Sequence, residues 1–196
     1  MRSPSEIRER LARVQEQVGP GVTVVAATKY VPLADMAALV EAGVEVVGEN
    51  RAQDLEAKHA EYGDAFRWHF IGHLQSNKVK VLNRICELVH SLDTDSAARR
   101  LEVPALVQVN LAGEASKSGV LPEEIEPFLR YDVRGLSTMP PAASSPEESR
   151  QWFSRLRALA SEHGLRELSM GTTQDYAVAA EEGATYVRVG SLLFHD

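Results

Sequence analysis

The sequence of 196 residues is poor in cysteine and has no long apolar run. Its single cysteine, Cys86, cannot form an internal disulfide, so we expect a reducing compartment, the cytoplasm. Cys86 lies in the apolar stretch RICELVHSL and is interpreted as a small core residue, not a nucleophile. No apolar stretch reaches the roughly 18 residues of a membrane span, and the charged N-terminal segment is unlike a signal peptide. We therefore expect no membrane association.

Positive charge is also scarce, with 21 Lys and Arg against 28 Asp and Glu and a formal net charge of -7. Such a balance disfavours long-range attraction of nucleic acid. One basic segment, from His73 to Arg84, carries Lys78 and Lys80. We interpret these cations as a solvated helix face, so binding of DNA or RNA is not expected.

Hydrophobic residues make up 44% of the sequence, which is enough for one sizeable core. We therefore expect a single domain over residues 1–196. Short β-branched runs alternate with segments of helical periodicity. The longest predicted helix runs from Ser145, as N-cap, to Gly164. The predicted strands begin near residues 22, 44, 67, 85, 105, 132, 165 and 185.

Strands that are separated by helices run parallel, because only a crossover connection returns the chain to the same edge of a sheet. Eight such units after an N-terminal helix predict an α/β fold, a closed (β/α)₈ TIM barrel with one extra helix. The chain is short for this fold, which takes about 250 residues as a rule. An open doubly wound sheet is the alternative, but the sequence lacks its glycine-rich βα turn.

The predicted strand ends carry polar residues, and in such barrels chemistry collects at the C-terminal ends of the strands. The first strand, in VTVVAATKYVP, ends on Lys29. A lysine at the mouth of a barrel is expected to be partly desolvated, which lowers its pKa and favours attack on carbonyls. The alternative is a lysine that extends to the rim or pairs with Glu49.

The loops after the last two strands, SMGTTQD and RVGS, combine glycines with hydroxyl side chains before helical segments. Barrels of this class often bind phosphate there. Gly171 and Gly190 could equally be simple turn residues. Together with Lys29, however, they fit a ligand with an aldehyde at one end and a phosphate at the other, which is the shape of pyridoxal 5′-phosphate.

Two histidines, His69 and His73, have a spacing that could suggest a metal site. They straddle a strand end and Gly72, so they do not share one helix face. We interpret each of them as a core or rim histidine, and we expect no metal.

Several longer motifs resemble those of the pyridoxal phosphate homeostasis proteins (the YggS/PROSC family), single-domain relatives of the alanine racemase barrel. The resemblance covers nearly the whole chain. It rests on ATKYVP, GENRAQ, WHFIGHLQSNK, HSLD, QVN, KSGV, LSMG and VRVGSLLF. WHFIGHLQSNK is the most specific of these motifs.

The resemblance implies that Lys29 forms an aldimine with the cofactor, that Asn50 lies near it, and that Arg188 faces the pyridine nitrogen. An arginine does not readily give up a proton, so that nitrogen would stay unprotonated and the ring would be a weak electron sink. The full set of implied cofactor-binding residues is Lys29, Asn50, Ser169, Thr173, Arg188, Gly190 and Ser191. The sequence departs from the family pattern at Thr172, in place of methionine, at Thr173, in place of serine, and at Ser137, in place of methionine, and its segment 93–104 is shorter than usual.

The function implied is storage, buffering or delivery of the cofactor in vitamin B6 homeostasis, without vigorous catalysis. Racemases use a lysine and a tyrosine on opposite faces of the cofactor, and none of the five tyrosines stands out as the second base. The alternative is a racemase-like enzyme of low activity that depends on pyridoxal phosphate. A barrel that binds a phosphorylated sugar without a covalent bond is a third possibility. We expect a monomer with transient contacts to enzymes that use the cofactor.

Overall fold

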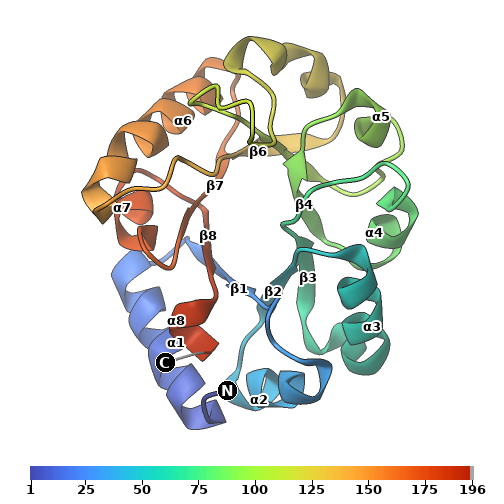
Figure 1. Cartoon of the computed structure of the whole chain (residues 1–196), viewed down its shortest axis with the longest axis vertical. Coiled ribbons are helices and arrows are strands. Elements are labelled where there is room, and N and C mark those ends of the chain that lie inside the picture. Colours follow the sequence, from blue (N-terminus) through green and yellow to red (C-terminus); the bar gives the residue numbers. More distant parts are fainter. Residues whose placement is uncertain (195–196) are drawn as a thin grey trace.

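The computed structural model describes residues 1–194, in which eight parallel strands close into one barrel (Figure 1). Each strand pairs with its neighbour in sequence, and β1 pairs with β8, which closes the ring. The predicted barrel is therefore confirmed. The strands are β1 (Thr23–Ala27), β2 (Val46–Glu49), β3 (Arg67–Phe70), β4 (Leu88–Leu92), β5 (Ala105–Gln108), β6 (Val133–Ser137), β7 (Glu167–Thr172) and β8 (Tyr186–Val189).

The helices surround the barrel, and the N-terminal α1 packs against α2, α7 and α8 (Figure 1). Ser3 caps α1 in a reciprocal arrangement with Glu6, as the sequence Ser-Pro-Ser-Glu favours. None of the helices among residues 1–194 is long and apolar enough to cross a bilayer. The helices are α1 (Pro4–Val18), α2 (Met36–Ala42), α3 (Ala52–Tyr62), α4 (Val79–Ile85), α5 (Asp95–Ala98), α6 (Arg150–Glu162), α7 (Tyr176–Glu181) and α8 (Ser191–Phe194).

Two connections are less regular than an α-helix. Between β5 and β6 the chain forms only 3₁₀ turns, Pro122–Glu124 and Glu126–Arg130, because Pro127 lacks the N–H that a continuous helix needs. The helix predicted from Ser145 begins instead with a 3₁₀ turn, Pro146–Ser149, before α6. The side chain of Glu148 there bonds back to Ser144 N at 2.9 Å, which tightens the first turn.

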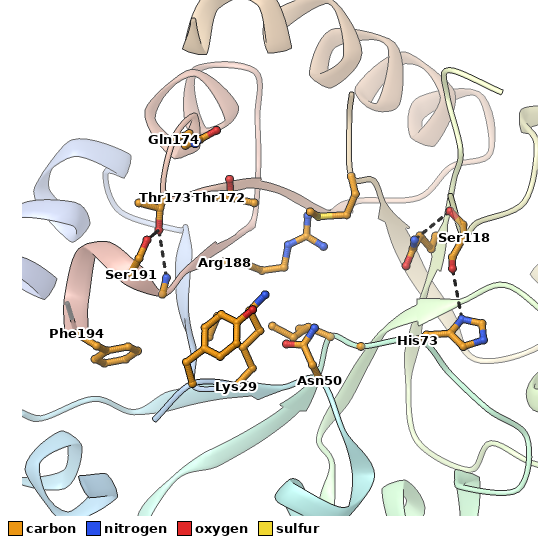
Figure 2. A pocket seen from close by; sticks show the side chains of 17 residues that line it. Lys29, Asn50, His73, Ser118, Thr172, Thr173, Gln174, Arg188, Ser191 and Phe194 are labelled. Carbon is orange, nitrogen blue, oxygen red and sulfur yellow. Dashed lines mark hydrogen bonds between the residues drawn. The ribbon is translucent and has the colours of Figure 1, made fainter. Parts of the chain in front are cut away.

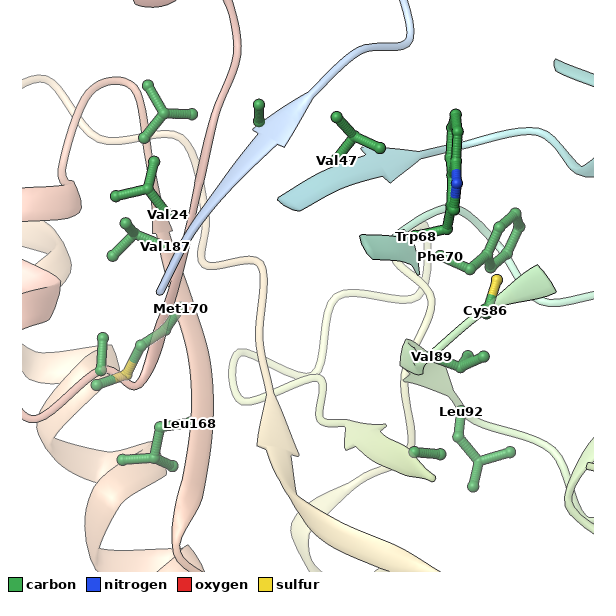
Figure 3. Packing of buried hydrophobic residues seen from close by; sticks show 14 of the residues in the cluster. Val24, Val47, Trp68, Phe70, Cys86, Val89, Leu92, Leu168, Met170 and Val187 are labelled. Carbon is green, nitrogen blue, oxygen red and sulfur yellow. The ribbon is translucent and has the colours of Figure 1, made fainter. Parts of the chain in front are cut away.

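The main core fills the space between the sheet and the helices (Figure 3). Strand residues such as Val47, Trp68 and Val187 point outward from the barrel into this layer. Cys86 is buried in the same layer, and burial raises the pKa of its thiol to about 12. The interpretation of Cys86 as a core residue is therefore confirmed.

The inside of the barrel contains a polar chain that joins three strands. His69 Nδ1 of β3 lies 2.9 Å from His90 Nε2 of β4, and His90 Nδ1 lies 2.8 Å from Ser169 Oγ of β7. Since β4 and β7 are not neighbours in the sheet, these side chains must meet across the interior. Ser137 donates a further hydrogen bond to the carbonyl of His90, so the interior polar groups form one buried network.

Candidate cofactor site at the mouth of the barrel

A cavity of about 450 Å³ lies at the C-terminal ends of the strands, which is within the usual size range of small-molecule sites. Figure 2 shows Thr173 and Ser191 together at one end and His73 with Ser118 at the other. Lys29, Asn50 and Arg188 lie between them. The barrel thus brings together residues that lie far apart in the sequence, such as Lys29 and Ser191, which are 162 positions apart.

Six of the seven predicted site residues line this cavity: Lys29, Asn50, Thr173, Arg188, Gly190 and Ser191. The seventh, Ser169, does not. It is fully buried in the middle of β7, where it contacts His90. The prediction placed Ser169 in the loop with Thr173, but the strand continues to Thr172 and leaves Ser169 deep inside the barrel. We therefore do not retain it as a candidate ligand.

Lys29 follows β1 at the centre of a turn, in which Val31 N donates to the carbonyl of Thr28 at 2.8 Å. Its side chain is exposed, and Nζ lies 4.6 Å from the ring centroid of Tyr30, a cation–π distance. The expectation of a partly desolvated lysine is therefore wrong. Pairing with Glu49 is also wrong, because Glu49 Oε1 contacts Lys58 Nζ at 2.5 Å. Lys29 is a rim residue whose amine is open to the cavity.

Arg188 is the buried cation of the site, with only 7% of its surface exposed. Nη2 donates to the carbonyl of Thr138 at 2.7 Å, while Nε has no protein partner. Burial lowers the pKa of Arg188 to about 10, which still leaves the guanidinium protonated at neutral pH. A buried donor without a partner is costly, and a ligand acceptor in the cavity would satisfy it.

Hydroxyl groups of Thr173 and Ser191 form the end of the cavity near β8. Thr173 Oγ1 accepts a hydrogen bond from Gly190 N at 3.3 Å and lies 3.5 Å from Ser191 Oγ. These weak internal bonds can be exchanged for bonds to an anion. The N–H of Thr172 is not available in the same way, because it donates to Asp175 Oδ1 at 2.7 Å.

The two glycines of the predicted phosphate loops have different roles. Gly171 has a φ of +89°, and an added Cβ would lie 2.5 Å from Cβ of Ala179. It is therefore required for the packing of α7 against β7 and does not line the cavity. Gly190 does line it, next to the carbonyl of Ala27, which an added Cβ would approach to 3.1 Å.

Several cavity residues were not predicted as site residues, among them Tyr30, His73, Gln108, Ser118 and Met139. Gln108 Nε2 donates to the carbonyl of Ser118 at 3.1 Å, which ties the loop after β5 back over the barrel. The motifs QVN and KSGV contain Gln108 and Ser118, so a signal existed. The motifs alone, however, do not show in which direction each side chain points.

The positions of the two histidines agree with their interpretation as core or rim residues. His69 is buried, whereas His73 is exposed at the cavity mouth, where Ser118 Oγ lies 3.4 Å from its Nδ1. Among residues 1–194, no cluster of three or more His, Cys, Asp or Glu side chains is suited to hold a metal ion.

Comparison with known proteins identifies the family of this chain. The family model of the alanine racemase N-terminal domain matches residues 3–196. A pyridoxal phosphate homeostasis protein of Aquifex aeolicus is 38% identical and the match covers 98% of this chain and 96% of the relative. One of Pseudomonas aeruginosa is 36% identical, with 97% and 95% covered.

Solved structures extend the comparison. PipY of Synechococcus elongatus PCC7942 with pyridoxal phosphate (PLP) bound superposes with a TM-score of 0.87 at 33% identity, over 96% of this chain and 99% of that one. A lysine/ornithine decarboxylase of Vibrio vulnificus shares the fold at 16% identity and a TM-score of 0.73, and this chain spans 62% of it. The chain belongs to the alanine racemase N-terminal domain family and, within it, to the pyridoxal phosphate homeostasis proteins.

Proposed function

We propose that this protein binds pyridoxal 5′-phosphate covalently through Lys29 and stores, buffers or delivers it in vitamin B6 homeostasis. The observation that carries the proposal is the position of three different groups around one cavity: the amine of Lys29, the buried guanidinium of Arg188 and the hydroxyls of Thr173 and Ser191. Relatives that match this chain over nearly its whole length are named for this role, and the PipY structure contains the cofactor.

The residues fit the chemistry of the cofactor. When bound, pyridoxal phosphate supplies an aldehyde carbon that condenses with a primary amine and releases one water. Lys29 supplies that amine, and it is the only cavity-lining lysine in the described part of the chain. Thr173, Gly190 and Ser191 offer hydroxyl and N–H donors to a phosphate. Arg188 offers its unpartnered Nε to the pyridine nitrogen and keeps that nitrogen unprotonated.

A role without turnover is supported by the positions of the tyrosines. Four of them bond elsewhere: Tyr62 to Leu33, Tyr131 to Asp95, Tyr176 to Gln17 and Tyr186 to Glu167. Tyr30 lines the cavity, but it is adjacent to Lys29 on the same turn. Proton transfer on both faces of the cofactor needs a second base opposite the lysine, and no tyrosine among residues 1–194 is placed for it.

The proposal includes a monomer in the cytoplasm that contacts cofactor-dependent enzymes transiently. The single, buried thiol of Cys86 is compatible with a reducing compartment. Gel filtration of the purified chain tests whether it is a monomer, and localisation of a tagged copy tests whether it is in the cytoplasm.

Absorbance and mass spectrometry test the central proposal. Addition of pyridoxal phosphate should produce a visible absorbance band, and borohydride should fix the cofactor to the peptide that contains Lys29. Lys29→Ala should abolish the fixed product and leave weaker binding that depends on the phosphate. An unchanged visible spectrum in this variant would refute the assignment.

The loaded protein should also leave single L-amino acids with their chirality intact. Exchange of the Cα proton at about one turnover per second or faster would place the protein with ordinary enzymes and exclude the carrier role. Absence of any covalent product would favour a barrel that binds a phosphorylated ligand without bonding to it.

A further inference from the structure

We propose that Lys58, a residue outside the cavity, positions Lys29 for its reaction with the aldehyde. Lys58 lies on α3 and is buried, with 5% of its surface exposed. Its Nζ donates to the backbone carbonyl of Thr28 at 2.8 Å and to Glu49 Oε1 at 2.5 Å. Thr28 immediately precedes Lys29, so the ammonium of Lys58 contacts the peptide that carries the reactive lysine.

The contact acts on the turn that presents Lys29. The carbonyl of Thr28 accepts one hydrogen bond from Val31 N, which closes the turn, and a second from Lys58 Nζ, both at 2.8 Å. On the other side, Thr28 N donates to the carbonyl of Gly48 at 3.0 Å. Contacts from within the turn, from β2 and from α3 therefore hold the backbone of Thr28, next to Lys29. They restrict the position of the Lys29 Cα, from which the reactive side chain extends.

Glu49 holds Lys58 in place. Its Oε1 accepts hydrogen bonds from Lys58 Nζ and from Thr28 Oγ1, each at 2.5 Å, and Glu49 is fully buried. Its Oε2 has no hydrogen-bond partner. Charges taken out of water lose hydration, and a well-packed apolar pair is often as stable as a buried ion pair. Stability alone therefore does not account for this pair, whereas a fixed position for Lys29 does.

Lys58 is not itself a second reactive amine for the cavity. Its Nζ is directed into the contacts with Glu49 and Thr28, and it does not line the cavity that contains Arg188 and Thr173. The two lysines thus have separate roles: Lys29 is placed to meet the ligand, and Lys58 orients the turn.

The inference rests on the proposed function, and two ligands separate the two claims. Pyridoxine 5′-phosphate carries an alcohol in place of the aldehyde, so it occupies the cavity without bonding to a lysine. The ratio of its Kd to the Kd of pyridoxal 5′-phosphate measures the covalent contribution of Lys29. A residue that only supports the cavity should change both constants together and leave the ratio unaltered.

Four variants are compared with the unaltered protein, each checked for folding by thermal unfolding. Lys58→Met removes the clamp but leaves Glu49 buried without its counter-charge, so this variant can fail to fold. The double variant Glu49→Gln with Lys58→Met removes both charges and decides the question. Lys80→Met, at an exposed position, is the matched control. Lys29→Ala gives the ratio without any covalent bond.

We expect the ratio to fall by about tenfold or more in the double variant and to stay within about twofold in Lys80→Met, because small misplacements of a reacting group have large effects. An unaltered ratio in the double variant would overturn the inference and leave the proposed function intact. An unaltered ratio in Lys29→Ala would instead overturn the proposed function.

Discussion

Arg188 and Thr138 are joined across the barrel mouth: Nη2 of Arg188, at the end of β8, donates to the carbonyl oxygen of Thr138, directly after β6, at 2.7 Å. These strands are not neighbours in the sheet, since β7 lies between them. The bond therefore fixes the guanidinium over the top of the barrel, with Nε left unpartnered.

Arg188→Ala should weaken the binding of pyridoxal 5′-phosphate by roughly 1.5–3 kcal/mol, the range for a hydrogen bond to a charged group. Arg188→Lys should lose nearly as much, because a single ammonium lacks the planar fork that serves Thr138 and the ligand together. Titration calorimetry at constant pH measures both changes. Unimpaired binding in Arg188→Ala would show that the guanidinium does not face the cofactor.

Thr173→Ala should weaken binding of the same ligand by roughly 1–3 kcal/mol, because it removes a hydroxyl from the proposed phosphate end of the cavity. Thr173→Ser keeps the hydroxyl and should bind nearly normally. Pyridoxal, which has no phosphate, provides the control. If the Ala variant lost as much affinity for pyridoxal as for pyridoxal 5′-phosphate, Thr173 would not act through the phosphate.

The buried pair His69 and His90 should make stability depend on pH. Desolvation lowers the pKa of His69 to about 4 and that of His90 well below its ordinary value, so both are neutral in the folded protein near pH 7. In the unfolded chain these histidines take up a proton near pH 6.5, whereas in the folded chain they do so only at a lower pH. The contribution of the two neutral histidines to stability is therefore complete above pH 6.5 and is lost progressively as the pH falls towards 4.

For His69 alone this difference amounts to about 2 kcal/mol between pH 7.5 and pH 5. Denaturant unfolding at the two pH values measures it. His69→Gln keeps a polar partner for His90 and should reduce the loss by about that amount. A variant that lost as much stability as the unaltered protein would show that His69 does not contribute to the pH dependence.

Much of the fold could be predicted because its signals are local. Val24 and Val25 of β1 are buried in the parallel sheet, as are apolar residues of the other strands. Strands that are buried on both faces appear in the sequence as continuous β-branched runs between helical segments. The order of strands and helices then allows few topologies. The break in the connection before β6 also has a local cause, because Pro127 cannot donate the backbone hydrogen bond that a continuous helix needs.

Predicting the site depended on one topological fact: parallel strands place their C-terminal ends at the same edge. Once the barrel was assumed, Lys29, Asn50 and Arg188 had to converge, and they line one cavity. Their roles toward a cofactor remain predictions. Ser169 was misplaced because neighbouring positions on one strand differ in depth, and a motif such as SMGTT does not say where the strand stops.

The sequence by itself determined the order of strands and helices and the set of polar residues at the strand ends, and it favoured a closed barrel over an open sheet, because buried strands and helices leave a periodic apolar pattern in the chain. Only the tertiary structure decided that Glu49 pairs with Lys58, that Lys29 stays exposed and that Ser169 meets His90. Those choices depend on strand register and on the packing of α3 against the barrel, which bring together side chains from distant segments, and no local pattern records them.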